Sequence, residues 1–437
     1  MSEPARRSLG LWMCTALVVG NMIGSGVFLL PASLAPFGGI SVLGWLFSSA
    51  GAVCLALVFA QLARQLPKIG GPYAFARQGF GDFGGFLVAW SYWTSVITSD
   101  AALAVAGVSY LTVFWPALSA SPLLGAVVAI GAVWLLTLVN LRGVHTAGQL
   151  QVVTTILKAL PLVAIGIFGL LSFNPAHFTP FNASDASPIA AISATVTLTL
   201  WAFLGLESGT VPAADIKNPE RTIPRATLLG TSIAAGIYIL STVSVMGMIA
   251  PNDLARSTAP FADAASRIWG SWGRALIAAG AAISCFGALN GWVLLSGQMP
   301  RAAALDGLLP SRLARVNARG APAFGLVLSS SLATILVLMN YTRGLVQAFT
   351  FMILLATLAT LLPYVFSSMT AVLLTVRDGV RPGRALAQLL IAVIAFAFSF
   401  WAIAGAGRDV VYWGFLLLIV GLPIYIVMRR KSELHDR

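Results

Sequence analysis

Three charged residues stand inside long apolar stretches of the chain, and they are the first candidates for chemistry. Asp100, Lys158 and Glu207 each fall near the middle of a run long enough to cross a membrane. A charge at that depth is costly and usually marks a substrate, ion or proton pathway. Each of the three is therefore a candidate functional residue.

Asp100 follows Tyr92 by two helical turns, with Val96 between them, so the three share one helical face. A carboxylate and an aromatic ring that face a cavity suit an organic cation. Asp100 could instead pair only with Lys158, which would neutralise both charges at lower cost.

Lys158 stands about ten residues, or about 15 Å, from either end of its apolar run, too far for comfortable snorkelling. We expect an internal partner. One interpretation is a fixed brace on backbone carbonyls, and the other is a proton-linked or ion-substituting cation.

Glu207 lies in Trp201-Ala-Phe-Leu-Gly-Leu-Glu-Ser-Gly209, where two glycines in an apolar run favour a break in the helix. A desolvated carboxyl beside such a break is expected to respond to pH. Glu207 could also act structurally, by capping the backbone amides that the break frees.

Trp201 precedes this break by one turn, and Trp292 stands mid-run in Asn290-Gly-Trp-Val-Leu-Leu-Ser-Gly-Gln298. An indole beside a carboxylate forms a cation–π site, worth about 2 kcal/mol when desolvated. Simple packing is the alternative for either side chain.

The composition indicates which elements position these residues. Of the 437 residues, 58% are hydrophobic and 9% charged, against about 45–50% and about 25% in soluble domains. This excludes a soluble enzyme or nucleic-acid binder and predicts an all-α polytopic membrane protein.

The three cysteines and three histidines form no disulfide framework, metal site or catalytic cluster, so no metal and no cofactor are expected. The single intramembrane charges do not form the rings of a channel.

We predict twelve transmembrane helices, each bounded by Gly, Pro, Asn or Arg. They cover 10–33, 40–63, 84–113, 121–141, 148–172, 189–213, 226–250, 273–298, 322–341, 346–375, 385–404 and 410–429. Arg6 and Arg7 before the first run imitate a signal peptide, but polar Asn21 and the absence of a small-residue cleavage site favour an uncleaved span.

The basic residues predict the orientation. With twelve spans, 20 of the 26 Lys and Arg fall on the side of the two termini, five on the other, and Lys158 within a span. The positive-inside rule then places both termini in the cytoplasm. The net charge of +12 reflects topology and contact with the lipid bilayer, with no nucleic acid as partner.

A second break is predicted in the first span, at Gly20-Asn-Met-Ile-Gly-Ser-Gly26. The broken spans 1 and 6 would each be the first of a group of five spans, 1–5 and 6–10. Because five is odd, the second group enters from the opposite face, which makes a 5+5 inverted repeat. The units are a cytoplasmic N-terminus at 1–9, repeat halves at 10–172 and 189–376, two further spans at 385–429 and a tail at 430–437. Paired breaks in inverted halves are typical of a transporter site.

The breaks and two more segments carry a family resemblance. Gly20-Asn-Met-Ile-Gly-Ser-Gly-Val-Phe-Leu-Leu-Pro31, Leu200-Trp-Ala-Phe-Leu-Gly-Leu-Glu-Ser208, Lys217-Asn-Pro-Glu-Arg221 and Gly291-Trp-Val-Leu-Leu-Ser-Gly-Gln298 resemble the amino acid/polyamine/organocation (APC) superfamily, and above all its bacterial arginine/agmatine antiporter branch. The likeness runs over nearly the whole chain. It implies a LeuT-like broken-helix fold, transport by alternating access without a cofactor, a bacterial inner-membrane location and a homodimer.

The resemblance also implies roles for individual residues. Ser25 and Gly26 would hold a substrate carboxylate, the carbonyls of Met22, Trp201 and Leu204 would receive its α-amino group, and Trp292 would stack on a cationic side chain. Other implied substrate-binding positions are Asn21, Ser95, Val96, Asp100 and Ala356. Tyr92, Trp201, Glu207 and Tyr364 match the gate and proton-sensing positions.

Three positions depart from the arginine/agmatine branch. Asp100 replaces Asn, Ala356 replaces Ser, and Lys158 replaces an apolar residue; Lys158 resembles instead the lysine that stands in for a sodium ion in other branches. We predict an exchanger that prefers a cationic amino acid or its decarboxylated amine. The alternative is a proton-coupled or neutral amino acid carrier, in which Lys158 takes up the charge of Asp100.

Overall fold

The protein is all-helical in the parts that the structure describes. The computed structural model describes residues 10–66, 70–142, 157–210, 216–377 and 382–435, and every regular element in these ranges is an α or 3-10 helix. Ten helical stretches within them are long and apolar enough to cross a membrane. The predicted class of all-α polytopic membrane protein is therefore confirmed.

The first of these stretches, Leu11–Gln65, contains several elements. They are α1 (Leu11–Met22), α2 (Gly26–Leu34), η1 (Ala35–Ile40) and α3 (Ser41–Gln65). A shorter apolar helical stretch covers Leu157–Ser172, and the part of its predicted span at 148–156 lies outside the described residues.

The remaining elements follow in chain order. They are α4 (Pro72–Leu111), α5 (Ala117–Ala120), α6 (Pro122–Leu141), η2 (Gly169–Ser172), η3 (Pro175–Phe178), α8 (Pro188–Leu200), η4 (Trp201–Phe203), η5 (Leu206–Thr210), α9 (Pro219–Met248), α10 (Pro251–Arg256), α11 (Pro260–Leu305), η7 (Ser311–Ala314), α12 (Ala323–Asn340), η8 (Tyr341–Arg343), α13 (Leu345–Arg377), α14 (Pro382–Gly405) and α15 (Arg408–His435). Helix α9 begins at Pro219 rather than at the predicted residue 226. Its proline at the first helical position, after Asn218 in a left-handed conformation, explains the early start.

Two very long helices are each divided by a glycine. Gly81 in α4 has φ +72° and Gly270 in α11 has φ +68°, so a short helix leads into a long one at both places. The predicted spans at 84–113 and 273–298 begin just after these glycines, because the short leading helices carry more polar residues.

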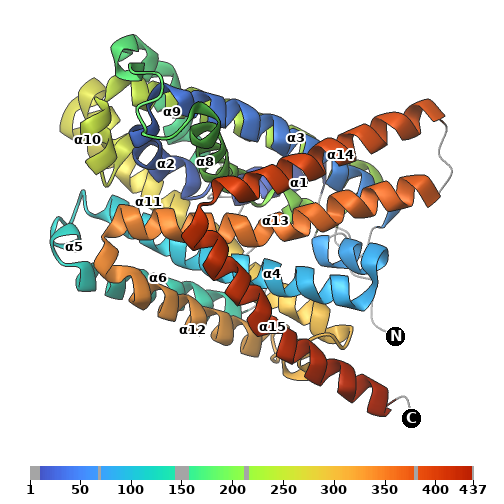
Figure 1. The fold of residues 1–437 in the computed structure, drawn as a ribbon. Helices are drawn as coiled ribbons and strands as arrows, with labels where there is room; N and C mark the ends of the chain where they lie inside the picture. The colour runs from blue at the N-terminus through green and yellow to red at the C-terminus, as the bar shows by residue number, and fades with distance from the viewer. Residues whose placement is uncertain (1–9, 67–69, 143–156, 211–215, 378–381, 436–437) are drawn as a thin grey trace.

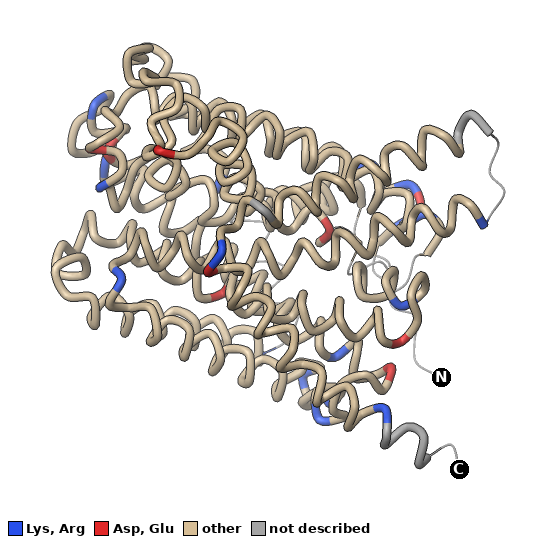
Figure 2. The backbone as a smooth tube through the Cα atoms, in the orientation of Figure 1, with Lys and Arg blue, Asp and Glu red and all other residues tan. Residues whose placement is uncertain are grey.

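Helix α4 lies at the centre of the bundle, where it packs against α11 and α13. Figure 1 shows the long helices running side by side, with α5 and α10 at one end and the last turns of α15 at the other. Most charged residues lie near the helix ends, as Figure 2 shows. Helices α14 and α15 form an outer layer, with only 22% and 17% of their most apolar windows buried.

The helices are interrupted at both predicted breaks. Helix α1 ends at Met22, Ile23 leaves the helical region with ψ 85°, and α2 begins at Gly26. Helix α8 ends at Leu200, Leu204 is extended, and Gly205 has φ +101° before η5 begins. The conformation at Gly205 is one that L side chains rarely adopt.

Replacing Gly205 by Ala should therefore destabilise the protein. A Cβ there would lie 3.1 Å from the backbone carbon of Asn21 and would also strain the positive φ. We expect a loss of about 1–3 kcal/mol, measured as a lower melting temperature of the detergent-solubilised protein. Gly236→Ala in α9 is the control, because open space surrounds that Cβ position. Equal melting temperatures for the two variants would contradict the assigned strain.

Candidate functional site

The two helix breaks meet in the interior. A Cβ on Gly26 would lie 2.9 Å from the Trp201 ring, and a Cβ on Gly205 would touch the backbone of Asn21. The start of α2 and the η4 turn therefore touch, and the α1 end touches the turn before η5. This contact places the predicted substrate positions on the two breaks side by side.

Glu207 is the centre of a buried hydrogen-bond cluster. The Tyr92 hydroxyl donates to Oε1 over 2.7 Å, and the Tyr364 hydroxyl donates to Oε2 over 2.9 Å. The Gly205 N–H also donates to Oε2, over 3.2 Å. All three side chains are buried. One carboxyl group thus links α4, α13 and the break after α8, and three of the four predicted gate residues lie together.

Asp100 and Lys158 do not form the ion pair that the sequence left open. The Lys158 ammonium donates instead to the Gly20 carbonyl over 3.0 Å, at the break after α1. Both oxygens of Asp100 are buried and have no hydrogen-bond partner in the described parts of the chain. The carboxyl group of Asp100 is thus uncompensated in this conformation.

Two of the predicted substrate-binding residues at the breaks also have a buried polar atom without a partner among the described residues. The two atoms are Ser25 Oγ, just before α2, and Trp201 Nε1, at the start of η4. Burying a polar group without a hydrogen bond costs about 1–3 kcal/mol in proteins, so such groups are expected to have a partner in some functional state. Both residues were predicted to contact substrate.

The other predicted positions are also buried. They are Asn21, Met22, Ser95, Val96, Leu204, Trp292 and Ala356. Ser95 already uses its hydroxyl, which donates to the Ala356 carbonyl over 2.8 Å and bonds the Thr360 hydroxyl. It therefore ties α4 to α13 in this conformation. The site as a whole is closed to solvent.

Three participants in these contacts were not named among the predicted site residues. The Gly20 carbonyl binds Lys158, the Gly205 N–H binds Glu207, and Thr360 binds Ser95. For the first two, the sequence analysis predicted the kind of contact as one alternative, Lys158 on backbone carbonyls and Glu207 on freed amides, but not which backbone group takes part. Thr360 stands one helical turn after Ala356, and that spacing was its only signal.

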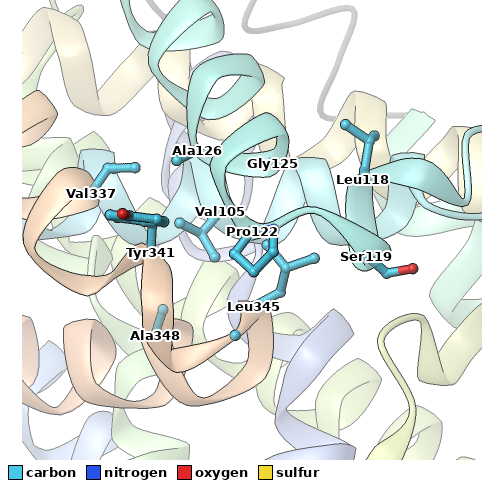
Figure 3. A pocket seen from close by; sticks show the side chains of 11 residues that line it. Val105, Leu118, Ser119, Pro122, Gly125, Ala126, Val337, Tyr341, Leu345 and Ala348 are labelled. Carbon is cyan, nitrogen blue, oxygen red and sulfur yellow. The ribbon is translucent and has the colours of Figure 1, made fainter.

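A small pocket shown in Figure 3 lies away from these residues. Its volume is about 40 Å³, and α4, α5, α6, α12 and the beginning of α13 contribute side chains such as Val105, Leu118 and Leu345. It contains none of the predicted site residues. A volume of this order suits about one water molecule, so it cannot take an amino acid.

The amino acid permease family model matches residues 9–428. The chain belongs to the amino acid permease family. The cadaverine/lysine antiporter of Escherichia coli strain K12 is 35% identical over 436 residues, which cover 98% of this chain and 97% of that protein. The putrescine transporter PotE of the same strain is 31% identical over 438 residues, with both chains fully covered. PotE of Haemophilus influenzae is 31% identical over 427 residues and 98% of each chain.

Membership of the amino acid permease family confirms the resemblance to the APC superfamily and makes the chain a transporter rather than an enzyme. The likeness to the arginine/agmatine branch stays a prediction, because the relatives above are named for lysine, cadaverine and putrescine.

Replacing Tyr364 by Phe should destabilise this closed conformation. The change removes one of the three donors to the buried Glu207 carboxyl, and a hydrogen bond to a charged group contributes about 1.5–3 kcal/mol. Thermal unfolding in detergent measures the loss. The control is Ser367→Ala on the same helix, because the Ser367 hydroxyl is buried and has no partner among the described residues. A Tyr364→Phe protein as stable as the control would contradict the role of this bond.

Proposed function

We propose that the protein is an antiporter that exchanges a cationic amino acid for its decarboxylated amine across the bacterial inner membrane. Family membership and the names of the relatives support this class of substrate. Transport would proceed by alternating access, with the two helix breaks as the binding site at the midplane.

The proposed preference for a cationic substrate rests on the unpaired carboxyl group of Asp100. Lys158 is bound to the Gly20 carbonyl and does not neutralise it. A buried charge without a partner is strongly unfavourable, whereas a substrate ammonium would pair with it. Trp292 on α11, which packs against α4, would stack on the same cationic end.

The opposite end of an amino acid substrate would lie on the breaks. Ser25 and Gly26 at the start of α2 offer a hydroxyl and free backbone N–H groups to a carboxylate, with the helix dipole in support. The carbonyls of Met22, Trp201 and Leu204 would accept from the α-amino group. A decarboxylated amine would lack the contacts at Ser25 and Gly26 but keep the pairing with Asp100.

Glu207 would act as a proton-sensitive gate. Its carboxyl group binds Tyr92 and Tyr364 from helices on two sides of the site. Protonation would weaken these bonds, since hydrogen bonds to a charged acceptor are roughly twice as strong as neutral ones. Trp201 beside the break would move with this gate.

The proposed membrane arrangement has twelve crossings in a 5+5 inverted repeat of the LeuT-like type, with both termini in the cytoplasm. The stretch Leu11–Gln65 would supply two crossings and Leu157–Ser172 part of another. The halves would be 10–172 and 189–376. A homodimer would form through the outer layer of α14 and α15.

One observation favours a second candidate, a proton-coupled or neutral amino acid carrier. Lys158 reaches the Gly20 carbonyl at the first break, where a cation could brace the unwound backbone. If Lys158 released its proton during transport, the carrier would need no substrate on the opposite side.

Uptake into proteoliposomes tests the proposal. Labelled lysine, ornithine, arginine, histidine and alanine are offered to vesicles that are empty or preloaded with unlabelled substrate or its amine. We expect a cationic substrate to enter only preloaded vesicles. Entry of alanine into empty vesicles when the outside is acidified would contradict the exchanger and support the carrier that uses Lys158.

Asp100→Asn should weaken binding of cationic substrates more than of neutral ones. The change removes the charge but keeps the shape, and a buried charge pair that loses one partner costs about 3–5 kcal/mol, or more than a hundredfold in affinity. Competition by lysine and by a neutral analogue of similar length measures the difference. Equal losses for the two ligands would argue against a direct contact.

A further inference from the structure

Helix α9 carries four buried hydroxyl groups on one face that bond to no described residue. They belong to Thr227, Thr231, Tyr238 and Thr242, all with 0% exposure. At 100° per residue their spacing confines them to an arc of about 60°, and they extend over about 22 Å of the helix. The four hydroxyls are called the α9 hydroxyl stripe below.

Buried threonine hydroxyls outside α9 all have a partner among the described residues, whereas a few buried serines, such as Ser25 and Ser367, have none. Thr137, Thr195 and Thr357 each donate to the carbonyl four residues earlier. On α9 itself, Ser241 donates to the Tyr238 carbonyl and Ser244 to the Gly166 carbonyl, and both lie outside the arc. The buried hydroxyls of α9 that lack a partner are therefore confined to the stripe.

Tyr238 of the stripe lies beside the break after α8. The Tyr238 ring lies 5.6 Å from Trp45 of α3 and 5.6 Å from Phe203 of η4, between ring centroids. The indole nitrogen of Trp45 is also buried without a partner among the described residues, and so is the hydroxyl of Ser208, next to Glu207. Helix α9 packs directly against α3 and η5. Unsatisfied groups thus occur along α9 from its first turns onward and, at Tyr238, Trp45 and Ser208, beside the break that carries Glu207.

Buried polar groups without a protein partner are usually bonded to ordered water. A water needs two to four polar partners, and the stripe, Trp45 and Ser208 supply donors and acceptors on facing elements. We propose that a file of ordered water molecules lies between α9 and α3 and conducts protons between the first turns of α9 and Glu207. Each water would accept one proton as it donates another, and the last would protonate a Glu207 carboxylate oxygen.

The proposal explains how a proton could reach a fully buried carboxyl group. The titratable side chains that face Glu207 are Tyr92 from α4 and Tyr364 from α13. Of the other elements packed on η5, α1 has no charged residue, α3 has only Arg64 in its last turn, and α9 has Glu220, Arg221 and Arg225 in its first two turns and Tyr238 further along. The proton-conducting part of the inference rests on the gate role proposed for Glu207, whereas the water file does not.

Hydroxyl-radical footprinting in lipid nanodiscs tests the water file without reference to transport. X-ray radiolysis of bound water oxidises adjacent side chains, and Tyr238 should be oxidised several-fold faster than Tyr110. Tyr110 is the matched control, because it is equally buried but its hydroxyl donates to the Phe28 carbonyl and accepts from the Phe261 N–H. Equal and slow oxidation of the two tyrosines would overturn the proposal.

Thr231→Val interrupts the stripe with little change in shape, and Thr227→Val serves the same purpose if the first variant does not fold. Either should lower the oxidation of Tyr238 several-fold and slow the response of transport to a rapid pH change. Ser241→Ala, off the stripe, should leave both unchanged. A higher melting temperature of Thr231→Val with unchanged oxidation would show a dry interface and contradict the file.

Glu207→Gln separates the two proposals. Loss of pH dependence in this variant, with Tyr238 still oxidised, supports both. If pH dependence persists in Glu207→Gln, the gate role fails, while the oxidation of Tyr238 still decides whether the water file exists. If Tyr238 is oxidised but Thr231→Val and Thr227→Val both leave the pH response of transport unchanged, the proposed proton conduction is overturned.

Discussion

The hydrogen bonds of Glu207 are the interaction on which the observed conformation depends. A break in a membrane helix frees backbone groups that the lipid cannot satisfy. Here one carboxyl group accepts from the Gly205 N–H at the break and from tyrosines on α4 and α13. The same side chain thus satisfies a backbone N–H at the break and joins α4 to α13. A change in the charge of Glu207 therefore affects both the break and the contact between these helices.

The buried polar groups without a hydrogen bond indicate what kind of substrate the site could bind. Lys158 is held by the Gly20 carbonyl, so its charge supports the first break rather than Asp100. Asp100, Ser25 and Trp201 keep buried polar atoms without a partner in the described parts of the chain. An amino acid with a cationic side chain carries groups complementary to all three: an ammonium for the carboxylate, and a carboxylate for the hydroxyl and the indole N–H. Specificity would follow because a neutral analogue leaves Asp100 unpaired.

The sequence alone predicted the breaks and the intramembrane charges, because charged residues and closely spaced glycines stand out in apolar runs, whereas the gate residues were assigned from the family resemblance. It could not decide between the partners of Lys158, since that choice depends on which carbonyl a break turns inward. Capping of freed amides by Glu207 was predicted as one alternative, but the sequence did not indicate that the Gly205 N–H is the amide bonded. The early start of α9 and the short helices before Gly81 and Gly270 were missed because their polar residues resemble loops. The α9 hydroxyl stripe escaped notice because threonine in a helix usually bonds its own backbone.

A cryo-electron microscopy structure of the protein in nanodiscs with bound cadaverine tests the central claim most directly. We predict one ammonium nitrogen about 3 Å from a carboxylate oxygen of Asp100, with Lys158 still bound to the Gly20 carbonyl. A diamine bound away from Asp100, with Asp100 and Lys158 joined in an ion pair, would contradict the role of Asp100 as the partner of the substrate cation.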